Sequence, residues 1–156
     1  MIWNEFKNNV EKWAAERGIY DHSTPEAQLL KALSELGELA DAVIKNDPEA
    51  LKDAIGDVTV CLVNYARMAN LDTGWPCFDA SEYISTYDII GTLSILIGRH
   101  LERAKCDADV IVMLCSLVGI AQRENLIFTE CCEAAWNEIK DRKGRMVMGG
   151  AFVKED

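Results

Sequence analysis

The sequence has few prolines, no long apolar run and a deficit of basic residues. Only 3 prolines and 10 glycines occur in 156 residues, which argues against a disordered or collagen-like chain. The longest apolar run, residues 110–121, is interrupted by Ser116 and falls well short of the roughly 20 residues that span a bilayer. Glu5 and Lys7 stand where a signal peptide would have its apolar stretch. We therefore expect a soluble cytoplasmic protein that does not enter a membrane.

Motifs of several common metal and nucleotide sites are also absent. His22 and His100 are the only histidines, and no two of the 6 cysteines are spaced as C-x-x-C, so a zinc finger has no ligand set. The patterns H-E-x-x-H, G-x-x-x-x-G-K-[ST], G-x-G-x-x-G and E-x-x-H do not occur. Zincin, P-loop, Rossmann and di-iron assignments therefore lose their usual support, and the cysteines are expected to be reduced thiols.

The charge balance excludes one class of partner. The 16 Lys and Arg against 26 Asp and Glu give a net charge of −10, whereas nucleic-acid polymers are held mainly by clustered basic residues. The acidic excess is concentrated in residues 21–60, and residues 136–156 carry a basic cluster. This distribution suits a protein that holds a metal cation, or one that is simply kept soluble.

Apolar residues recur with helical spacing along nearly the whole chain. Helices are expected over residues 2–17, 25–46, 48–71, 79–105, 107–124 and 129–142, with possible strand alternation only near 146–153. Ser23 and Glu26 are spaced as a capping box for the second helix, and Asp79 with Glu82 begins the fourth. We predict one all-α domain over residues 1–156, a helical bundle of about five or six helices.

The helix expected at residues 51–69 contains polar residues in an apolar setting. It is apolar around almost its whole circumference, which predicts burial. Asp53, Asp57 and Asn64 nevertheless lie within about 40° of one another on its surface, at 100° per residue. Because a buried ionised carboxylate is costly unless it is paired, hydrogen-bonded or bound to metal, Asp57 predicts a bound cation or a Lys or Arg partner.

The preceding helix supplies further carboxylates, Glu35 and Glu38. A turn after residue 46 would bring them opposite Asp53 and Asp57, at heights that match to within a turn or two. Hard oxygen ligands without nearby His or Cys suit Mg²⁺ or Mn²⁺ rather than zinc. The alternative is that Glu35 and Glu38 lie on a solvated face. The apolar stripe expected on this helix consists of Leu29, Leu33, Leu36, Ala40 and Val43.

Two segments of the chain resemble a known family. Residues 33–40 read L-S-E-L-G-E-L-A and residues 53–58 read D-A-I-G-D-V. Together they resemble the MazG-like all-α nucleoside triphosphate pyrophosphohydrolases, particularly short phage and bacterial members, whose signature is E-E-x-x-E, a spacer, then E-x-x-D. Ser34 stands where the first Glu often stands, and Ala54 where the second half has its Glu, with Asp53 one position earlier. The segment 135–145 resembles the late Asn/Lys segment of the family more weakly.

The resemblance implies Mg²⁺-dependent hydrolysis of a nucleoside or deoxynucleoside triphosphate to the monophosphate and pyrophosphate. The implied metal ligands are Glu35, Glu38, Asp53 and Asp57, and Glu35 or Glu38 would orient or deprotonate the attacking water. Implied substrate-binding residues are Lys31, Asn64, Asn137, Lys140, Lys143 and Arg145. An exposed surface lysine is the alternative for Lys31, and a solvated helix end is the alternative for the basic residues of the tail. The helices at about 24–71 would carry the metal site, and residues 129–156 the C-terminal helix and basic tail.

The resemblance further implies a homo-oligomer, a dimer or tetramer. The apolar segment 108–121 favours the same expectation, because it needs covering. The competing interpretation of the whole chain is a catalytically degenerate helical protein that binds nucleotides or serves in assembly.

Overall fold

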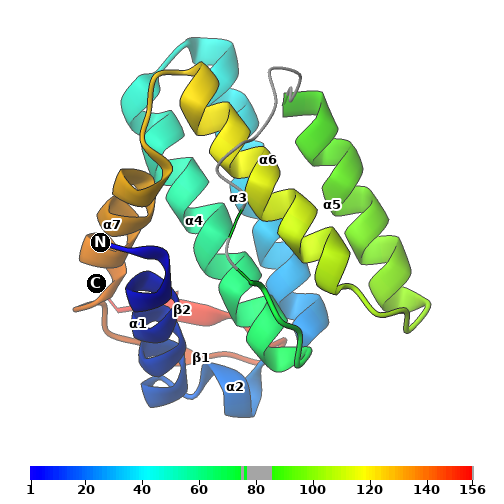
Figure 1. Ribbon diagram of the computed structural model, residues 1–156. Coiled ribbons are helices and arrows are strands. Elements are labelled where there is room, and N and C mark those ends of the chain that lie inside the picture. Colours follow the sequence, from blue (N-terminus) through cyan, green and yellow to red (C-terminus); the bar gives the residue numbers. More distant parts are fainter. Residues whose placement is uncertain (75, 77–85, 156) are drawn as a thin grey trace.

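Helices dominate the computed structural model, which describes residues 1–74, 76 and 86–155 (Figure 1). The described elements are α1 (Trp3–Glu16), α2 (Ile19–His22), α3 (Pro25–Lys45), α4 (Pro48–Met68), α5 (Thr86–Leu101), α6 (Asp107–Arg123), α7 (Phe128–Ile139), β1 (Gly144–Met146) and β2 (Phe152–Lys154). The predicted all-α class is confirmed. The expected start of the fourth helix, Asp79 and Glu82, lies outside the described residues.

Two short elements differ from the expectation. α2 has only 4 residues, too few to show a helical period. The alternation near residues 146–153 belongs to a hairpin in which β1 and β2 pair antiparallel, with Arg145 opposite Val153.

α3 and α4 form the central helix pair of the fold (Figure 1). The side chain of Thr24 accepts a backbone hydrogen bond at 3.1 Å and caps α3, so the predicted cap at Ser23 is wrong by one residue. Asn46 ends α3 in the left-handed conformation, with φ 53°, and Asp47 caps α4. This two-residue connection makes the helices antiparallel, as the sequence predicts.

The buried face of α3 is rotated from the predicted stripe. Leu33 is 48% exposed, and α3 is buried instead along a neighbouring line of residues. That line consists of Gln28, Leu29, Ala32, Glu35, Leu36, Leu39 and Ala42. The solvated-face alternative is therefore wrong for Glu35, which is 6% exposed, whereas Glu38 is exposed. Packing against α4 selects this line over the stripe through Leu33.

α6 is covered within a single chain. Its buried residues include Val110, Met113, Leu114 and Leu117, and it packs against α4, α5 and α7. Most of the apolar segment 108–121 is therefore covered within one chain, although Val112 is 50% exposed, so this segment gives little reason to expect a second copy. A dimer or tetramer stays a prediction of the resemblance alone, and the cytoplasmic location stays a prediction from the sequence.

No single helix among the described residues is long and apolar enough to cross a membrane. α6 and α7 together meet the criteria of length and composition, but the chain bends by 105° between them.

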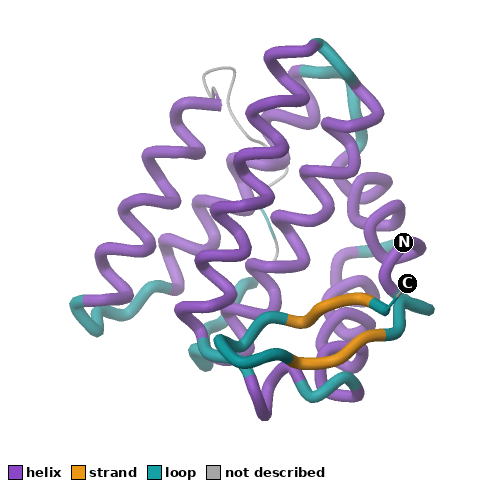
Figure 2. The backbone as a smooth tube through the Cα atoms, turned by 180° about the vertical axis from the view of Figure 1, so that it is seen from behind, coloured by secondary structure: helices purple, strands orange, loops and turns teal. Residues whose placement is uncertain are grey.

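The C-terminal hairpin lies across one end of the α3–α4 pair (Figure 2). Gly150 at its tip has φ +80°, which L side chains rarely adopt, and a Cβ there would lie 3.1 Å from the Cα of Ser23. The ring of Phe152 meets the ring of Trp13 edge-on, with centroids 5.6 Å apart. The hairpin is thus held against both the start of α3 and the end of α1.

Candidate functional site

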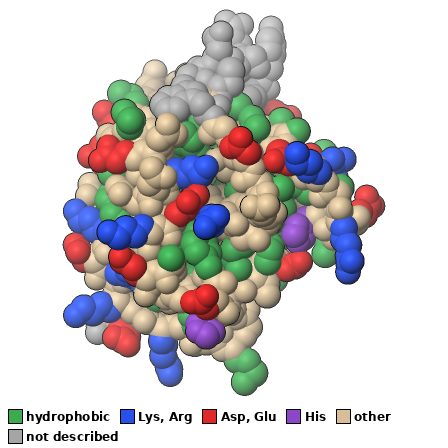
Figure 3. Space-filling model, turned by 60° about the horizontal axis from the view of Figure 1, so that its bottom comes forward, with side chains coloured by type: hydrophobic (Ala, Val, Ile, Leu, Met, Phe, Trp, Pro, Cys, Tyr) green, Lys and Arg blue, Asp and Glu red, His purple; other side chains and the backbone are tan. Residues whose placement is uncertain are grey.

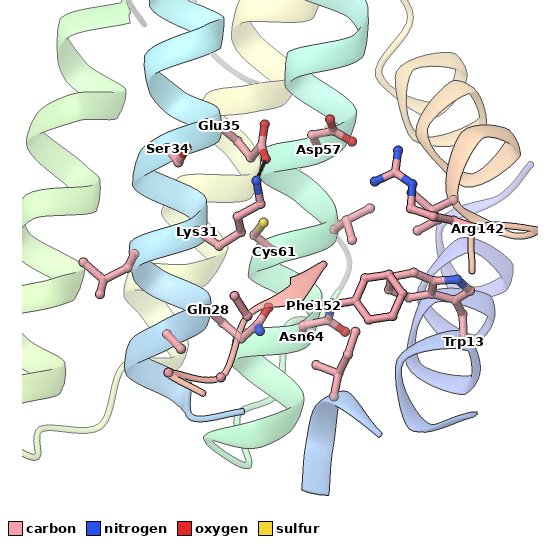
Figure 4. A pocket seen from close by; sticks show the side chains of 18 residues that line it. Trp13, Gln28, Lys31, Ser34, Glu35, Asp57, Cys61, Asn64, Arg142 and Phe152 are labelled. Carbon is pink, nitrogen blue, oxygen red and sulfur yellow. Dashed lines mark ion pairs between the residues drawn. The ribbon is translucent and has the colours of Figure 1, made fainter. Parts of the chain in front are cut away.

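A pocket of about 470 Å³ lies between α3, α4, α1 and the C-terminal hairpin (Figure 4). Its polar side chains come chiefly from the two central helices, and Trp13, Arg142 and Phe152 lie along another side. Across the α3–α4 pair, Gln28 lies opposite Asn64, Lys31 opposite Cys61, and Glu35 opposite Asp57.

Helix geometry arranges this pocket in two levels. Glu35 follows Gln28 by seven residues, and Asn64 follows Asp57 by seven, so each pair occupies one helix face about 10 Å apart along the axis. Because α3 and α4 run antiparallel, the two carboxylates meet at one level and the two amides at the other. We call these the carboxylate level (Glu35, Asp57) and the amide level (Gln28, Asn64).

Asp57 shows that the carboxylate level has an excess of negative charge. Burial raises the pKa of its carboxyl, and the nearby carboxylates of Glu35, Asp53 and Glu138 raise it further, to about 7. The guanidinium of Arg142 lowers the same pKa without cancelling the rise. In Figure 4 the side chain of Asp57 lies between Glu35 and Arg142.

Lys31 supplies the nearest cation to Glu35. Its Nζ forms an ion pair with Oε1 of Glu35, and the side chain of Glu35 is 8% exposed against 57% for Lys31. Burial opposes the charge on Lys31, but the hydrogen bond and charge of Glu35 raise the pKa of the ammonium above its usual value. Lys31 therefore reaches from an exposed position into the carboxylate level, where the sequence also allowed a plain surface lysine.

The other two predicted metal ligands line an adjoining cavity of about 540 Å³. Glu38 and Asp53 lie there, and Ser34 lines both spaces. Burial raises the pKa of Asp53, as do the carboxylate of Glu138 and, more weakly, those of Glu35 and Glu38. The structure thus divides the four predicted ligands into two neighbouring pairs that influence each other through their charge.

A divalent cation fits these residues by donor chemistry. Among the described residues no three His, Cys, Asp or Glu side chains are grouped closely enough to hold a metal ion. Burial and, after it, neighbouring carboxylates nevertheless raise the pKa values of Asp53 and Asp57. An added cation relieves the repulsion between the carboxylates, and their oxygens suit Mg²⁺ or Mn²⁺. A divalent cation therefore matches these carboxylates in charge and in ligand type. One of them, Glu35, is at present ion-paired with Lys31.

Most of the basic tail lies outside the pocket. Asn137, Lys140, Lys143 and Arg145 are exposed and do not line it, and Lys140 Nζ donates to Oδ1 of Asn137 at 2.9 Å. Arg142 is the basic residue of this segment that lines the pocket. These four residues remain predictions of the resemblance without a place at the carboxylate level.

Sequence reasoning missed Glu138 and Arg142, which form an ion pair with each other beside Asp57. Their spacing of four is typical of a helix pair, but α7 ends at Ile139, before Arg142. Arg17 holds the following turn: its Nε donates to the carbonyl oxygen of Arg142 at 2.8 Å. No local sequence pattern predicts this contact, because the two arginines are 125 residues apart.

Acidic and basic side chains are interspersed on the face of the molecule near the bottom of Figure 1, as Figure 3 shows. This face carries no broad basic surface of the kind that binds nucleic-acid polymers. Several acids of residues 21–60 instead line the two cavities between α3 and α4, so their charge acts mainly there.

Comparisons with known proteins place the carboxylates inside a matched segment. The MazG nucleotide pyrophosphohydrolase domain matches residues 23–86, which include Glu35, Glu38, Asp53 and Asp57. The chain is also similar to an uncharacterized 18.2 kDa protein in the rep-hol intergenic region of Haemophilus phage HP1 (strain HP1c1). The two are 30% identical over 152 residues, covering 81% of this chain and 93% of the phage protein. No solved structure gives a significant match.

Proposed function

Because the chain belongs to the MazG nucleotide pyrophosphohydrolase family, we propose that it hydrolyses a nucleoside or deoxynucleoside triphosphate to the monophosphate and pyrophosphate, with Mg²⁺ as cofactor. The observation that carries this proposal is the pair of carboxylates, Glu35 and Asp57, facing one pocket together with the cations of Lys31 and Arg142. Carboxylates suit a divalent cation, and Lys and Arg suit phosphate oxygens, so the pocket suits a metal-bound triphosphate.

Glu35 and Asp57 would hold the ion at the carboxylate level, with Glu38 and Asp53 in the adjoining cavity. A divalent cation, Mg²⁺ or Mn²⁺, would offset the charge of the triphosphate and lower the pKa of a water molecule. Two acids of the family signature are replaced in this chain, by Ser34 and Ala54. The four remaining carboxylates would therefore be the donors to the metal.

The residues of the pocket can divide the chemistry among them. Lys31 and Arg142 bind phosphate oxygens and stabilise the charge that develops on the leaving pyrophosphate. Glu35 orients the attacking water and accepts its proton; Glu38, in the adjoining cavity, is the alternative. The water oxygen bonds to the α-phosphorus while the bond from that phosphorus to the bridging oxygen breaks.

Incubation with each nucleoside and deoxynucleoside triphosphate in the presence of Mg²⁺ tests the proposal. Monophosphate and pyrophosphate are the expected products, and Glu35→Gln is expected to lower turnover by at least about 100-fold. Glu102→Gln, at an exposed acid outside the described pockets, should retain wild-type turnover. Nucleotide binding without turnover in the wild-type protein would instead support the catalytically degenerate binding protein.

Lys31→Met is expected to strengthen Mg²⁺ binding while it lowers turnover. The substitution removes the cation that is paired with Glu35, so that carboxylate becomes available to metal, but a phosphate contact is lost. We expect Mg²⁺ to bind about tenfold more tightly, a difference of about 1.4 kcal/mol. The readout is the rise in melting temperature on Mg²⁺ addition.

Lys12→Met is the matched control for that variant. Lys12 forms an ion pair with Glu16 four residues on, as Lys31 does with Glu35, but it lies on α1 outside the described pockets. Equal Mg²⁺-induced shifts in the two variants would show that Lys31 does not compete with metal.

A further inference from the structure

The amide level of the pocket carries two buried side chains that the proposed chemistry does not use. Gln28 is 8% exposed and Asn64 is 3% exposed, and both line the same pocket. In Figure 4 they face each other across the α3–α4 pair. Because buried polar groups are nearly always hydrogen-bonded, the partners of these amides determine what they offer a ligand.

One end of each amide is already bonded within the protein. Tyr20 Oη donates to Oδ1 of Asn64 at 2.9 Å, and Nε2 of Gln28 donates to Oγ of Ser23 at 3.0 Å. The amino group of Asn64 and the carbonyl oxygen of Gln28 have no hydrogen-bond partner among the described residues. The amide level therefore presents one oriented donor and one oriented acceptor.

An aromatic wall stands beside this pair. Phe152 projects from β2 into the pocket lining, and Trp13 supports its ring at an interplanar angle of 71°. Gly149 and Gly150 bring the hairpin backbone to the same pocket without adding side chains. A flat apolar surface beside a donor and an acceptor is complementary to a heteroaromatic ring with polar edge atoms.

We propose that the amide level binds the nucleobase of the substrate: Asn64 donates to its edge, Gln28 accepts from its edge, and Phe152 covers its face. This inference rests on the proposed function, in which the carboxylate level takes the phosphates. The two levels lie about 10 Å apart along each helix, so a ligand with a ring at one end and phosphates at the other contacts both. Inorganic pyrophosphate would use the carboxylate level alone.

Calorimetric titration with a nucleoside monophosphate and with inorganic pyrophosphate, each with Mg²⁺, separates the two levels. Asn64→Ala, Gln28→Ala and Phe152→Ala are each expected to weaken monophosphate binding by about tenfold, since each removes a base contact. Pyrophosphate binding should change by less than about twofold. Asn8→Ala, which removes an exposed amide of α1, should change neither affinity.

The outcomes distinguish this inference from the proposed function. If the three variants weaken pyrophosphate binding as much as monophosphate binding, or change neither affinity, base binding at the amide level is overturned while the proposed function stands. If the wild-type protein binds neither ligand, both fail. Phe152→Leu removes the ring but keeps an apolar side chain at this half-buried hairpin position, and its melting temperature shows whether the fold is retained. A folded Phe152→Leu variant should also weaken monophosphate binding selectively.

Discussion

Replacing Asp57 with asparagine is expected to abolish triphosphate hydrolysis and, without metal, to make the protein more stable. Asp57 is one of the two carboxylates that face the pocket, so its loss removes a proposed metal ligand and should lower turnover by about 100-fold or more. Asparagine has nearly the same shape but no charge. The substitution therefore relieves the repulsion from Glu35, Asp53 and Glu138 with little change in packing.

The gain in stability should depend on pH. Burial and nearby carboxylates raise the pKa of Asp57 from 3.8 to about 7, so between these values the folded protein holds a proton that the unfolded chain releases. The contribution of Asp57 to the free energy of unfolding consequently falls as pH rises from about 4 to about 7, then stays low. The D57N variant lacks this decline, which is worth up to about 4 kcal/mol for three pKa units.

Urea unfolding at pH 5 and pH 8 with a chelator measures this difference. Relative to wild type, D57N should gain more stability at the higher pH. Asp41→Asn removes an exposed carboxylate that is ion-paired with Lys45, so it should show no such gain. A D57N variant that is less stable than wild type at pH 8 would contradict the account of carboxylate repulsion.

Gly56→Ala is expected to destabilise the protein and to disturb the site. Gly56 lies where α4 meets α7, and a Cβ there would come 2.6 Å from the Cβ of Ala135 and 2.6 Å from the carbonyl oxygen of Cys131. Because one of these contacts is with backbone, α7 must shift, at a cost of about 1–3 kcal/mol. α7 also carries Glu138, so turnover should fall as well.

Gly37→Ala is the matched control for Gly56→Ala. Gly37 lies inside α3, and a Cβ there meets nothing within 4 Å. Alanine should stabilise the helix at this position by about 0.5–1 kcal/mol, through its higher propensity. Equilibrium unfolding of both variants gives the comparison; equal stabilities for the two would contradict the close packing of α4 on α7.

The helix pair that carries the site could be predicted from the sequence because local signals define it. Pro25 begins α3, Asp47 caps α4, and the apolar pattern of α4 indicates burial. The burial of Glu35 could not be predicted in the same way, since two neighbouring lines of residues on α3 are both partly apolar. Only packing against α4 decides which line is buried, and Leu33 stays exposed to solvent.

The C-terminal side of the pocket could not be predicted, because contacts between distant residues place it. Arg142 is held by Arg17, 125 residues away in the chain, and Phe152 by Trp13. The basic cluster directs attention to this tail, but the sequence analysis chose Lys140, Lys143 and Arg145, whereas Arg142 lines the pocket. Which residue lines the pocket depends on where α7 ends and on how the hairpin folds back.

Hydrolysis in water enriched in oxygen-18 tests the central claim most directly. Nucleophilic attack of water at the α-phosphorus, with the wild-type protein, Mg²⁺ and a nucleoside triphosphate, should produce a monophosphate that carries the heavy oxygen and an unlabelled pyrophosphate. Mass spectrometry of the two products shows where the label lies. Label in pyrophosphate, or release of nucleoside diphosphate and inorganic phosphate, would contradict the account.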